Sequence, residues 1–335
     1  MKPIHIVTRG SALALAQANF ILSECQREFP ELKFAIKVIR TTGDKLQSAS
    51  LAQTTPSLPR GLFTKELEEA LFSGEGDLAV HSLKDLPTTL PEGLKLGATT
   101  KRADARDILI YREQSRASSG SGVHKQKRGF DPFKTLKGLP SRACIGTSSN
   151  RRAAQIQEMR PDLRVVPLRG NVGTRLKKLS ADAKLDAIVL AVAGLQRLGI
   201  EIDSEGRLRG KDVPPGLLGT ILPFEEMLPC VGQAAIGIEI RENDEIADAL
   251  CRIINHIPTW HCVTAERAFL CATGGGCQSA VAAYARMVGQ EIYMSAVSFL
   301  NQKAQRFEAK AAASEARDLG ERIAAELSVP QEVLT

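Results

Sequence analysis

The chain has 335 residues, of which 43% are hydrophobic and 24% charged, a composition typical of a globular protein with more than one domain. No apolar run approaches the roughly 18–20 residues that a membrane-spanning helix needs, and the first residues lack the apolar region and cleavage site of a signal peptide. We therefore expect a cytoplasmic protein with no membrane partner.

The seven cysteines are an odd number without any CxxC pair, which argues against a disulfide framework. His261, Cys262, Cys271 and Cys277 fit none of the usual spacings of a zinc site. Buried free thiols are the favoured interpretation and zinc is the minor alternative, so we expect no metal.

The net charge is +6, and residues 112–137 carry most of it, with seven basic and two acidic side chains. The same segment contains the flexible run Ser118–Gly122, and aromatic residues make up only 4% of the chain. We interpret the segment as a mobile, solvated insertion and expect no nucleic-acid partner. Nucleic-acid binding through this segment is the alternative, and it would make binding steeply dependent on salt.

The first 100 residues alternate between strand-like and helix-like runs, which predicts α/β units with a largely parallel sheet. Ser11 has the side chain and the position of a helix N-cap, and Gly74 follows the second helix. The predicted elements are the strand Ile4–Val7, the helix Leu13–Glu28, a strand over 34–38, the helix Phe63–Phe72 and the strand Asp77–His81.

The same alternation returns after residue 140, so the chain contains a second α/β half. Residues 187–192 are continuously apolar, as in a strand covered on both faces. The predicted elements are the strand Arg142–Ile145, the helix Arg151–Glu158, the strand Arg164–Leu168, the helix Val172–Leu179 and a strand over 186–192. Two such halves predict a ligand site in the crevice between them, as in hinged two-domain binding proteins.

The last part of the chain has a different pattern and predicts a small α+β domain. A helix over Val263–Leu270 leads into a glycine-rich turn, and Ser314–Leu327 predicts a final amphipathic helix. Between them, Ala280–Met287 and Glu291–Val297 read as two strands across a turn. We expect Cys277 to lie on the loop that faces the first two domains.

Arginines follow the predicted strands at several points, beginning with the run Gly146–Arg152. There a strand ends, hydroxyl side chains cap a helix, and Arg151 and Arg152 occupy its first turn. Backbone N–H groups and the helix dipole attract anions at such a terminus. Two arginines oppose that dipole, so a bound anion is expected to compensate them. The alternative is a pair of solvated surface arginines.

Leu168–Arg175 repeats this arrangement, with Arg169 after a strand and Arg175 in the following helix. Arg197 follows a third strand, and Arg9 follows the first. A guanidinium group binds carboxylate or phosphate through two parallel hydrogen bonds. So many arginines along one crevice predict a ligand with several anionic groups.

The run His81–Asp85 lies at the end of another predicted strand and faces the same crevice. A carboxylate among arginines is normally ionised, so Asp85 is able to stabilise a developing cation or to transfer protons. The alternative for Asp85 is an ordinary helix cap or ion-pair partner.

Cys277 follows three glycines, which allow the backbone to approach a ligand closely and expose the thiol. A cysteine protease would need a histidine partner, and none is obvious among the five histidines. No Gly-Lys-Ser/Thr follows the glycines, which argues against a phosphate-binding P-loop.

Taken in order, these runs resemble the porphobilinogen deaminase (hydroxymethylbilane synthase) family along nearly the whole chain. The matching runs are Thr8–Ala14, Thr42–Asp44, Gly61–Leu67, His81–Asp85, Gly146–Arg152, Leu168–Leu176, Leu190–Gly199, Val231–Gln233, Val263–Arg267 and Gly275–Gln278. The fold that this implies is α/β, with two periplasmic-binding-protein-like domains joined by a hinge and a small α+β C-terminal domain. We expect domain 1 to comprise 1–101 and 234–252, domain 2 to comprise 104–230, and domain 3 to comprise 257–335.

The resemblance implies a transferase of tetrapyrrole (haem) biosynthesis that condenses four porphobilinogen molecules with loss of ammonia and releases hydroxymethylbilane by hydrolysis. Its cofactor is a dipyrromethane in thioether linkage, which falls on Cys277, and its catalytic aspartate falls on Asp85. Each substrate carries an acetate and a propionate, which suits an arginine-lined crevice. The family also implies a monomer.

The resemblance further assigns residues to the cofactor and to the substrate. The cofactor-binding positions are Ser82, Lys84, Thr147, Ser148, Ser149, Arg151, Arg152 and Gly170, besides Cys277. The substrate-binding positions are Arg9, Ser11, Gln17, Arg60, Arg169, Arg175, Arg197 and Gln233.

The chain departs from the family pattern at a few positions. Arg60 stands where a lysine is usual and follows the longer run 53–59, Ser279-Ala280 follows Cys277-Gln278, and Ala234 replaces a glycine. None of these changes removes Cys277, Asp85 or a matched arginine, so we expect an active enzyme. The alternative is a non-enzymatic two-domain anion-binding protein, which would need the arginines but neither Cys277 nor the third domain.

Overall fold

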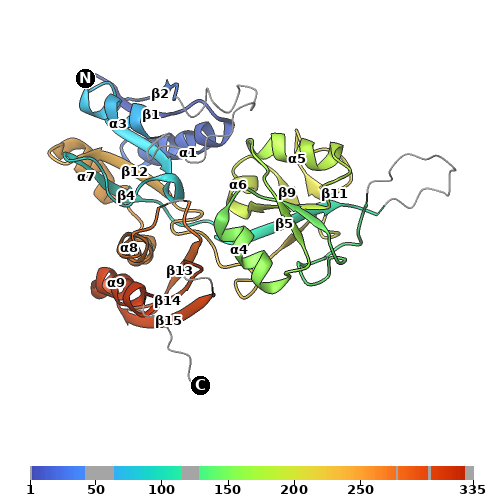
Figure 1. Cartoon of the computed structure of the whole chain (residues 1–335). Coiled ribbons are helices and arrows are strands. Elements are labelled where there is room, and N and C mark those ends of the chain that lie inside the picture. The colour runs from blue at the N-terminus through green and yellow to red at the C-terminus, as the bar shows by residue number, and fades with distance from the viewer. Residues whose placement is uncertain (1, 42–63, 115–127, 277, 301–302, 329–335) are drawn as a thin grey trace.

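The computed structural model describes residues 2–41, 64–114, 128–276, 278–300 and 303–328. It contains two five-stranded sheets and one three-stranded sheet, each with its own helices, and we call these three units domains 1, 2 and 3 in that order (Figure 1). A small two-stranded sheet, β10-β9, belongs to domain 2. The predicted fold class, two α/β domains with a smaller α+β domain, is confirmed. None of the helices in these ranges is long and apolar enough to cross a membrane.

Domain 1 is built on a sheet with the strand order β2-β1-β3-β12-β4. The first three of these strands are parallel, whereas β12 runs antiparallel to both of its neighbours. The strands are β1 (Ile4–Arg9), β2 (Phe34–Ile39), β3 (Leu78–Ser82), β4 (Leu94–Thr99) and β12 (Ile236–Arg241), and the helices are α1 (Ala12–Glu28), α3 (Lys65–Phe72) and α7 (Glu245–Ile254).

The helix α1 begins where the sequence predicted it. The Ser11 hydroxyl accepts a hydrogen bond from Ala14 N at 3.2 Å and so caps the first turn. Ala18, Ile21 and Cys25 follow at helical spacing and pack into the apolar core of the sheet. This packing fixes α1 directly behind the ends of β1 and β3, where Arg9 and Ser82 lie.

Domain 2 has a second mixed sheet, in the order β11-β5-β8-β6-β7. Strands β6, β7 and β8 are parallel, and β5 runs antiparallel to β8 and β11. Its elements are β5 (Asp107–Arg112), β6 (Cys144–Gly146), α4 (Asn150–Met159), β7 (Arg164–Val166), α5 (Val172–Ala181), β8 (Ala187–Ala191), α6 (Val192–Gln196), β9 (Glu201–Ile202), β10 (Leu208–Arg209) and β11 (Leu217–Ile221). Ile110 and Ile188 face one apolar cluster, and Leu109 and Val189 face the other, so both faces of the sheet are covered.

The chain crosses between the two domains twice. It leaves domain 1 after β4 through residues 100–106, and it returns after β11 through 222–235 to form β12. Two adjacent crossings of this kind form a hinge about which two domains rotate.

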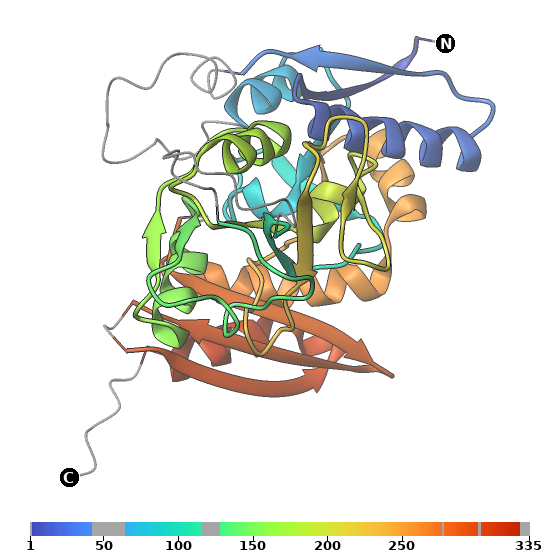
Figure 2. The ribbon, with the colours of Figure 1, turned by 90° about the vertical axis from the view of Figure 1, so that its right-hand side faces the viewer.

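Domain 3 packs its two long helices on one face of an antiparallel sheet, and this sheet lies at the lower end of the molecule in both views (Figures 1 and 2). Its elements are α8 (Ile257–Ala272), β13 (Val281–Val288), β14 (Glu291–Ser298), β15 (Gln305–Ala312) and α9 (Ala316–Glu326). The two helices touch at Gly320, where an added Cβ would lie 2.1 Å from Ala265 O. The strand β15 was not predicted, because its alanines and charged residues carry little strand propensity.

A buried carboxylate joins domain 3 to the hinge. Glu266 on α8 is fully buried and accepts hydrogen bonds from both Nη atoms of Arg102, at 2.6 and 3.1 Å. The backbone N–H groups of Gly232 and Ala285 also donate to Glu266. Arg102 and Gly232 belong to the two hinge crossings and Ala285 to β13, so one side chain ties three segments together.

The basic segment 112–137 is only partly described, since 115–127 lie outside the described residues. Its ends are not solvated as predicted, because Arg112, Phe130 and Leu136 are all buried. The Arg112 guanidinium donates to Arg128 O and to the carbonyl groups of Leu179 and Leu185. The interpretation of the whole segment as a solvated insertion is therefore wrong for both of its ends, which form part of the domain 2 core.

Candidate active site

The carboxyl ends of the strands carry the polar side chains that the sequence singled out. In domain 1, Arg9, Ser11, Gln17, Ser82 and Asp85 line one pocket beside the ends of β1 and β3. Carboxyl ends of parallel strands meet at one edge of a sheet, which explains why residues so far apart in sequence converge. The structure thus brings together five of the residues to which the resemblance assigned cofactor, substrate or catalytic roles.

The floor of the pocket is fixed by buried groups. The Ser82 hydroxyl donates to Gln17 Oε1 at 3.0 Å, and Gln17 is only 2% exposed. Gln17 Nε2 has no hydrogen-bond partner among the residues that the structure describes. A buried amide donor without a partner is costly, so this atom marks a position where a ligand acceptor is favoured.

Asp85 is presented at the surface by the short 3-10 helix η1 (Leu83–Asp85), which begins at the end of β3. Leu83 is buried in an apolar cluster with Leu86 and anchors this turn. Because the apolar side chains on either side point inward, the Asp85 carboxylate is left exposed and lines the pocket.

Lys84 lies between the two domains. Burial lowers its pKa, and this effect outweighs the neighbouring charge of Asp85, which raises it. The positive charge of Arg152, which belongs to domain 2, lowers the pKa of Lys84 further. The side chains of Lys84 and Arg152 are therefore close enough to interact across the interdomain crevice.

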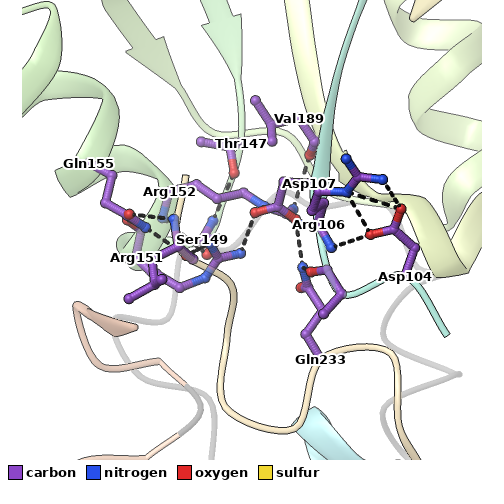
Figure 3. A network of polar contacts seen from close by, with 12 residues as sticks. Asp104, Arg106, Asp107, Thr147, Ser149, Arg151, Arg152, Gln155, Val189 and Gln233 are labelled. Atoms are coloured by element: carbon purple, nitrogen blue, oxygen red, sulfur yellow. Dashed lines mark hydrogen bonds and ion pairs between the residues drawn. The ribbon is translucent and has the colours of Figure 1, made fainter. Parts of the chain in front are cut away.

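On the domain 2 side, the first turn of α4 carries a buried ion network (Figure 3). Arg151 Nη2 donates to Asp107 Oδ2 at 2.8 Å, and Arg152 contacts the same carboxylate through Nη2 at 2.7 Å and Nε at 3.2 Å. Arg151 Nη1 also donates to Leu228 O, and Arg152 Nη1 to Val189 O. All three charged residues are at most 5% exposed.

Asp107 therefore supplies the negative charge that the two arginines require at the start of a helix. Burial by itself would raise the pKa of Asp107, but the charges of Arg151 and Arg152 outweigh burial and hold that pKa well below its usual range. The sequence predicts a bound anion as the charge that compensates the two arginines, whereas the structure shows that a carboxylate of the chain itself does so. The only signal in the sequence was a carboxylate at the start of an apolar strand.

Arg175 and Arg197 extend the positive charge along the crevice. Burial lowers the pKa of each to about 10. For Arg175, the charge of Arg152 contributes to this lowering of the pKa, and the charge of Asp85 in the other domain opposes it. Arg175 Nε donates to Gly170 O at 2.6 Å, and Arg197 Nη2 donates to Ala234 O at 2.6 Å.

The hydroxyl residues before α4 shape the loop that leads into this helix. The Thr147 hydroxyl accepts from Ser149 N at 3.2 Å, and the Ser148 hydroxyl accepts from Leu168 N at 3.0 Å. Ser149 caps α4 by accepting from Arg152 N. These bonds, with the hydrogen bond from Thr147 N to Val166 O, hold the loop close to β7 and to the segment that follows it.

Three further predicted site residues, Arg169, Gly170 and Gln233, differ in how exposed they are and in what they contact. Arg169 is exposed and lies on the loop between β7 and α5. Gly170 has a φ of 122°, and a Cβ there would meet Thr174 Cγ2 at 2.8 Å, so only glycine suits this turn. Gln233 is fully buried, and its amide donates to Asp107 Oδ1 and Ala105 O. Its position favours a supporting role behind the arginines.

Cys277 and Arg60 lie outside the described residues. The residues that flank Cys277 are described, and Gly276 N donates to the Ser279 hydroxyl at 2.8 Å. Asn150 Nδ2, at the start of α4, donates to Gln278 O at 2.9 Å. The loop of domain 3 that follows Cys277 is thus bonded to the helix that carries Arg151 and Arg152.

Arg267 ends one of the matching runs but was assigned no role, and it contacts the loop that follows Asp85. Its guanidinium donates to Leu86 O, Pro87 O and Thr88 O at 3.2, 2.7 and 3.3 Å. Arg267 belongs to α8, which lies between domain 1 and the sheet of domain 3 (Figure 1). One helix therefore links the Asp85 loop to the domain that contains Cys277.

The thiols and acids elsewhere form no second reactive centre in the described part of the chain. The six cysteines there are free, and no three His, Cys, Asp or Glu side chains among those residues are placed to hold a metal ion. Cys230 lies in the crevice, where burial raises its pKa although Arg151 and Lys84 lower it. A thiol with a raised pKa is a weak nucleophile.

Comparison with known proteins covers almost the whole chain. The family model described as "Porphobilinogen deaminase, dipyromethane cofactor binding domain" matches residues 4–249, and that described as "Porphobilinogen deaminase, C-terminal domain" matches 260–328. The porphobilinogen deaminase of Lawsonia intracellularis is 43% identical over 291 residues, which cover 87% of this chain and 82% of the relative. That of Syntrophus aciditrophicus is 41% identical over 326 residues, which cover 97% of this chain and 94% of the relative.

Proposed function

Since this chain belongs to the porphobilinogen deaminase family, we propose that it is a transferase that joins four porphobilinogen molecules head to tail on a dipyrromethane primer. Ammonia leaves at each addition, and hydrolysis then releases hydroxymethylbilane for tetrapyrrole biosynthesis. The observation that carries this proposal is the crevice itself, where Asp85 lies among cationic side chains contributed by both domains.

The described residues fit a primer that carries several carboxylates. Two buried donors, Gln17 Nε2 and Arg151 Nε, have no partner among those residues, one on each side of the crevice. We propose that Cys277 is the point of thioether attachment.

When bound, the dipyrromethane supplies the pyrrole carbon to which the first substrate is joined. Arg151 and Arg152 are proposed to hold its carboxylates, with Lys84 facing them from domain 1. Ser148 and Ser149 fix the loop that leads into α4 and its two arginines. With the primer bound, these groups would position its acceptor carbon relative to Asp85, and such positioning is worth a large part of a condensation barrier.

Asp85 is the proposed catalytic residue. As ammonia leaves the substrate, positive charge develops on the pyrrole that remains, and a carboxylate beside it lowers the energy of that state. Arg9 and Ser11 line the same pocket and are proposed to bind the substrate acetate and propionate. Asp85 is exposed, so its charge is available to the substrate and is not consumed by a buried partner.

Arg169, Arg175 and Arg197 are proposed to bind the carboxylates that accumulate as the chain lengthens. Arg175 and Arg197 each use one edge of the guanidinium for a backbone carbonyl, which leaves other N–H groups for a ligand. We propose that Arg60 binds the substrate. Gln233 is proposed to support substrate binding through its hydrogen bond to Asp107. We further propose that the protein is monomeric and cytoplasmic.

The mass of the intact, purified protein tests this function directly. The proposal requires an adduct of two pyrrole units that is absent from the variant Cys277→Ala. The alternative of a non-enzymatic anion-binding protein requires an unmodified chain that binds anions without turnover. If the wild-type chain remains unmodified after incubation with porphobilinogen, the enzymatic proposal is wrong.

A further inference from the structure

Asp107 combines complete burial with four hydrogen bonds to charged or polar side chains. Its Oδ1 accepts from Arg152 Nη2 at 2.7 Å and from Gln233 Nε2 at 2.8 Å. Its Oδ2 accepts from Arg151 Nη2 at 2.8 Å and Arg152 Nε at 3.2 Å. A carboxylate has about four acceptor sites, so these bonds occupy all of them. Asp107 thus has no free capacity for a substrate, a cation or a transferred proton.

We propose that Asp107 is the positioning residue of the primer site, which holds the guanidinium groups of Arg151 and Arg152 in one orientation so that their remaining N–H groups bind the primer carboxylates. This inference rests on the proposed function, because it deepens the role of the two arginines in the same crevice.

The orientation of each guanidinium group is fixed on two edges. Arg152 places Nε and Nη2 on Asp107 and Nη1 on Val189 O, and Arg151 places Nη2 on Asp107 and Nη1 on Leu228 O (Figure 3). A guanidinium group is planar, so bonds on two edges set both its position and the direction of its other N–H groups. Arg151 Nε is one of these, and it has no partner within the described ranges.

Asp107 also makes the crowding of positive charge possible. The charge of Arg152 lowers the pKa of Lys84 and Arg175, so these cations lie within electrostatic reach of one another. A fixed carboxylate behind the arginines offsets part of that repulsion, and the front of the site remains positive for an incoming anion. Removal of the Asp107 carboxylate would allow the guanidinium groups of Arg151 and Arg152 to turn away from the crevice.

The test compares Asp107→Asn with Asp186→Asn. Asparagine preserves the shape of the side chain and removes its charge. Asp186 is a suitable control because it is also a domain 2 aspartate, is 5% exposed and accepts from Cys144 N at 2.7 Å, but contacts neither Arg151 nor Arg152 in the described structure. Unmodified chains of wild type and both variants are incubated with porphobilinogen, and the appearance of the two-pyrrole adduct is followed by intact mass.

We expect Asp107→Asn to acquire the adduct at least about tenfold more slowly than wild type, with Asp186→Asn close to wild type. For the fraction that carries the adduct, kcat should fall by a similar factor while KM for porphobilinogen changes less than about twofold, because the loosened groups hold the primer and not the incoming substrate. Equal adduct formation and equal kinetics in the two variants would overturn the proposal.

A spectroscopic measurement separates positioning from a general loss of structure. In protein labelled with nitrogen-15 at arginine Nε, the Arg152 Nε–H that donates to Asp107 should exchange slowly with solvent and lose this protection in Asp107→Asn only. The resonance is assigned with Arg152→Lys. Protection that persists in Asp107→Asn contradicts the proposed clamp.

Asp107→Glu provides the second variant if Asp107→Asn does not fold. It retains the charge but displaces the carboxylate by one methylene, so slower adduct formation and lower kcat are still expected, and wild-type values would exclude positioning by Asp107. The wild-type sample separates this inference from the proposed function. A wild-type chain that never acquires the adduct refutes the function, whereas a modified wild type with a fully active Asp107→Asn refutes only the inference.

Discussion

The two walls of the crevice are built on different principles. In domain 1, Asp85 is exposed, and the groups around it leave hydrogen-bonding capacity for a ligand. In domain 2, Asp107 is fully buried, and its carboxylate is saturated by Arg151, Arg152 and Gln233. The same side-chain chemistry therefore serves two purposes, because exposure leaves a carboxylate available to the substrate whereas burial commits it to the structure.

The largest effect is expected at Asp85. Asp85→Ala should lower turnover by about 10²-fold or more, since it removes the charge that stabilises the developing cation. Because Asp85 is exposed, the free energy of unfolding should change by no more than about 0.5 kcal/mol. Steady-state turnover and urea unfolding measure the two effects. Substrate-derived material should stay attached to the protein, and normal turnover would exclude Asp85 as the catalytic residue.

At Asp107, in contrast to Asp85, substitution is expected to lower the free energy of unfolding strongly. Asp107→Asn leaves two buried arginines without their carboxylate, and removal of one partner from a buried ion pair typically costs about 3–5 kcal/mol. Urea unfolding of the chain without primer measures this loss, with Asp85→Ala as the exposed counterpart. A loss below about 1 kcal/mol would show that the network contributes little to folding and would remove the contrast between the two walls.

The pH dependence of stability sharpens the same contrast. The pKa of Asp107 is lower in the folded chain than its usual value of about 3.9, so its contribution is fully present above that value and is lost as the pH falls through the folded pKa. The free energy of unfolding should therefore decrease below about pH 4 in wild type. In Asp107→Asn this part of the decrease should be missing, and parallel curves for the two proteins would contradict the assignment.

The smallest effect is expected from deletion of residues 115–127. Gln114 N donates to Phe130 O at 3.0 Å and Phe130 N to Arg112 O at 2.8 Å, so the chain on either side of the deletion is already held together. With a short glycine linker in place of 115–127, kcat and KM should stay within about twofold of wild type. A deletion that extends through Phe130 is the destabilising control, because this side chain is buried. Loss of activity in the shorter deletion would show that the segment takes part in the reaction.

Much of the fold was readable from local patterns. The strand–helix alternation located β1 to β3, β6 to β8 and the helices between them to within a few residues, but it missed others, including β4, β5, β11, β12 and α7. Ser11 and Ser149 cap the helices α1 and α4. Such features are determined by neighbours in the sequence, since a cap bonds two or three residues ahead and a helix shows its apolar face every third or fourth residue. The third strand of domain 3, β15, was not predicted, because its sequence is rich in alanine and charged residues, which are uncommon in strands.

The sequence by itself indicated several side chains that lie at the crevice, because Arg9, Asp85 and Arg151 each lie at or shortly after the end of a strand. Only the tertiary structure decided which of them are exposed to a ligand and which are committed to one another. Asp107 pairs with arginines 44 and 45 residues away and with Gln233 at a separation of 126. No local periodicity reports such a pairing, because the partner of a buried charge is chosen by the packing of strands and helices that are distant in sequence.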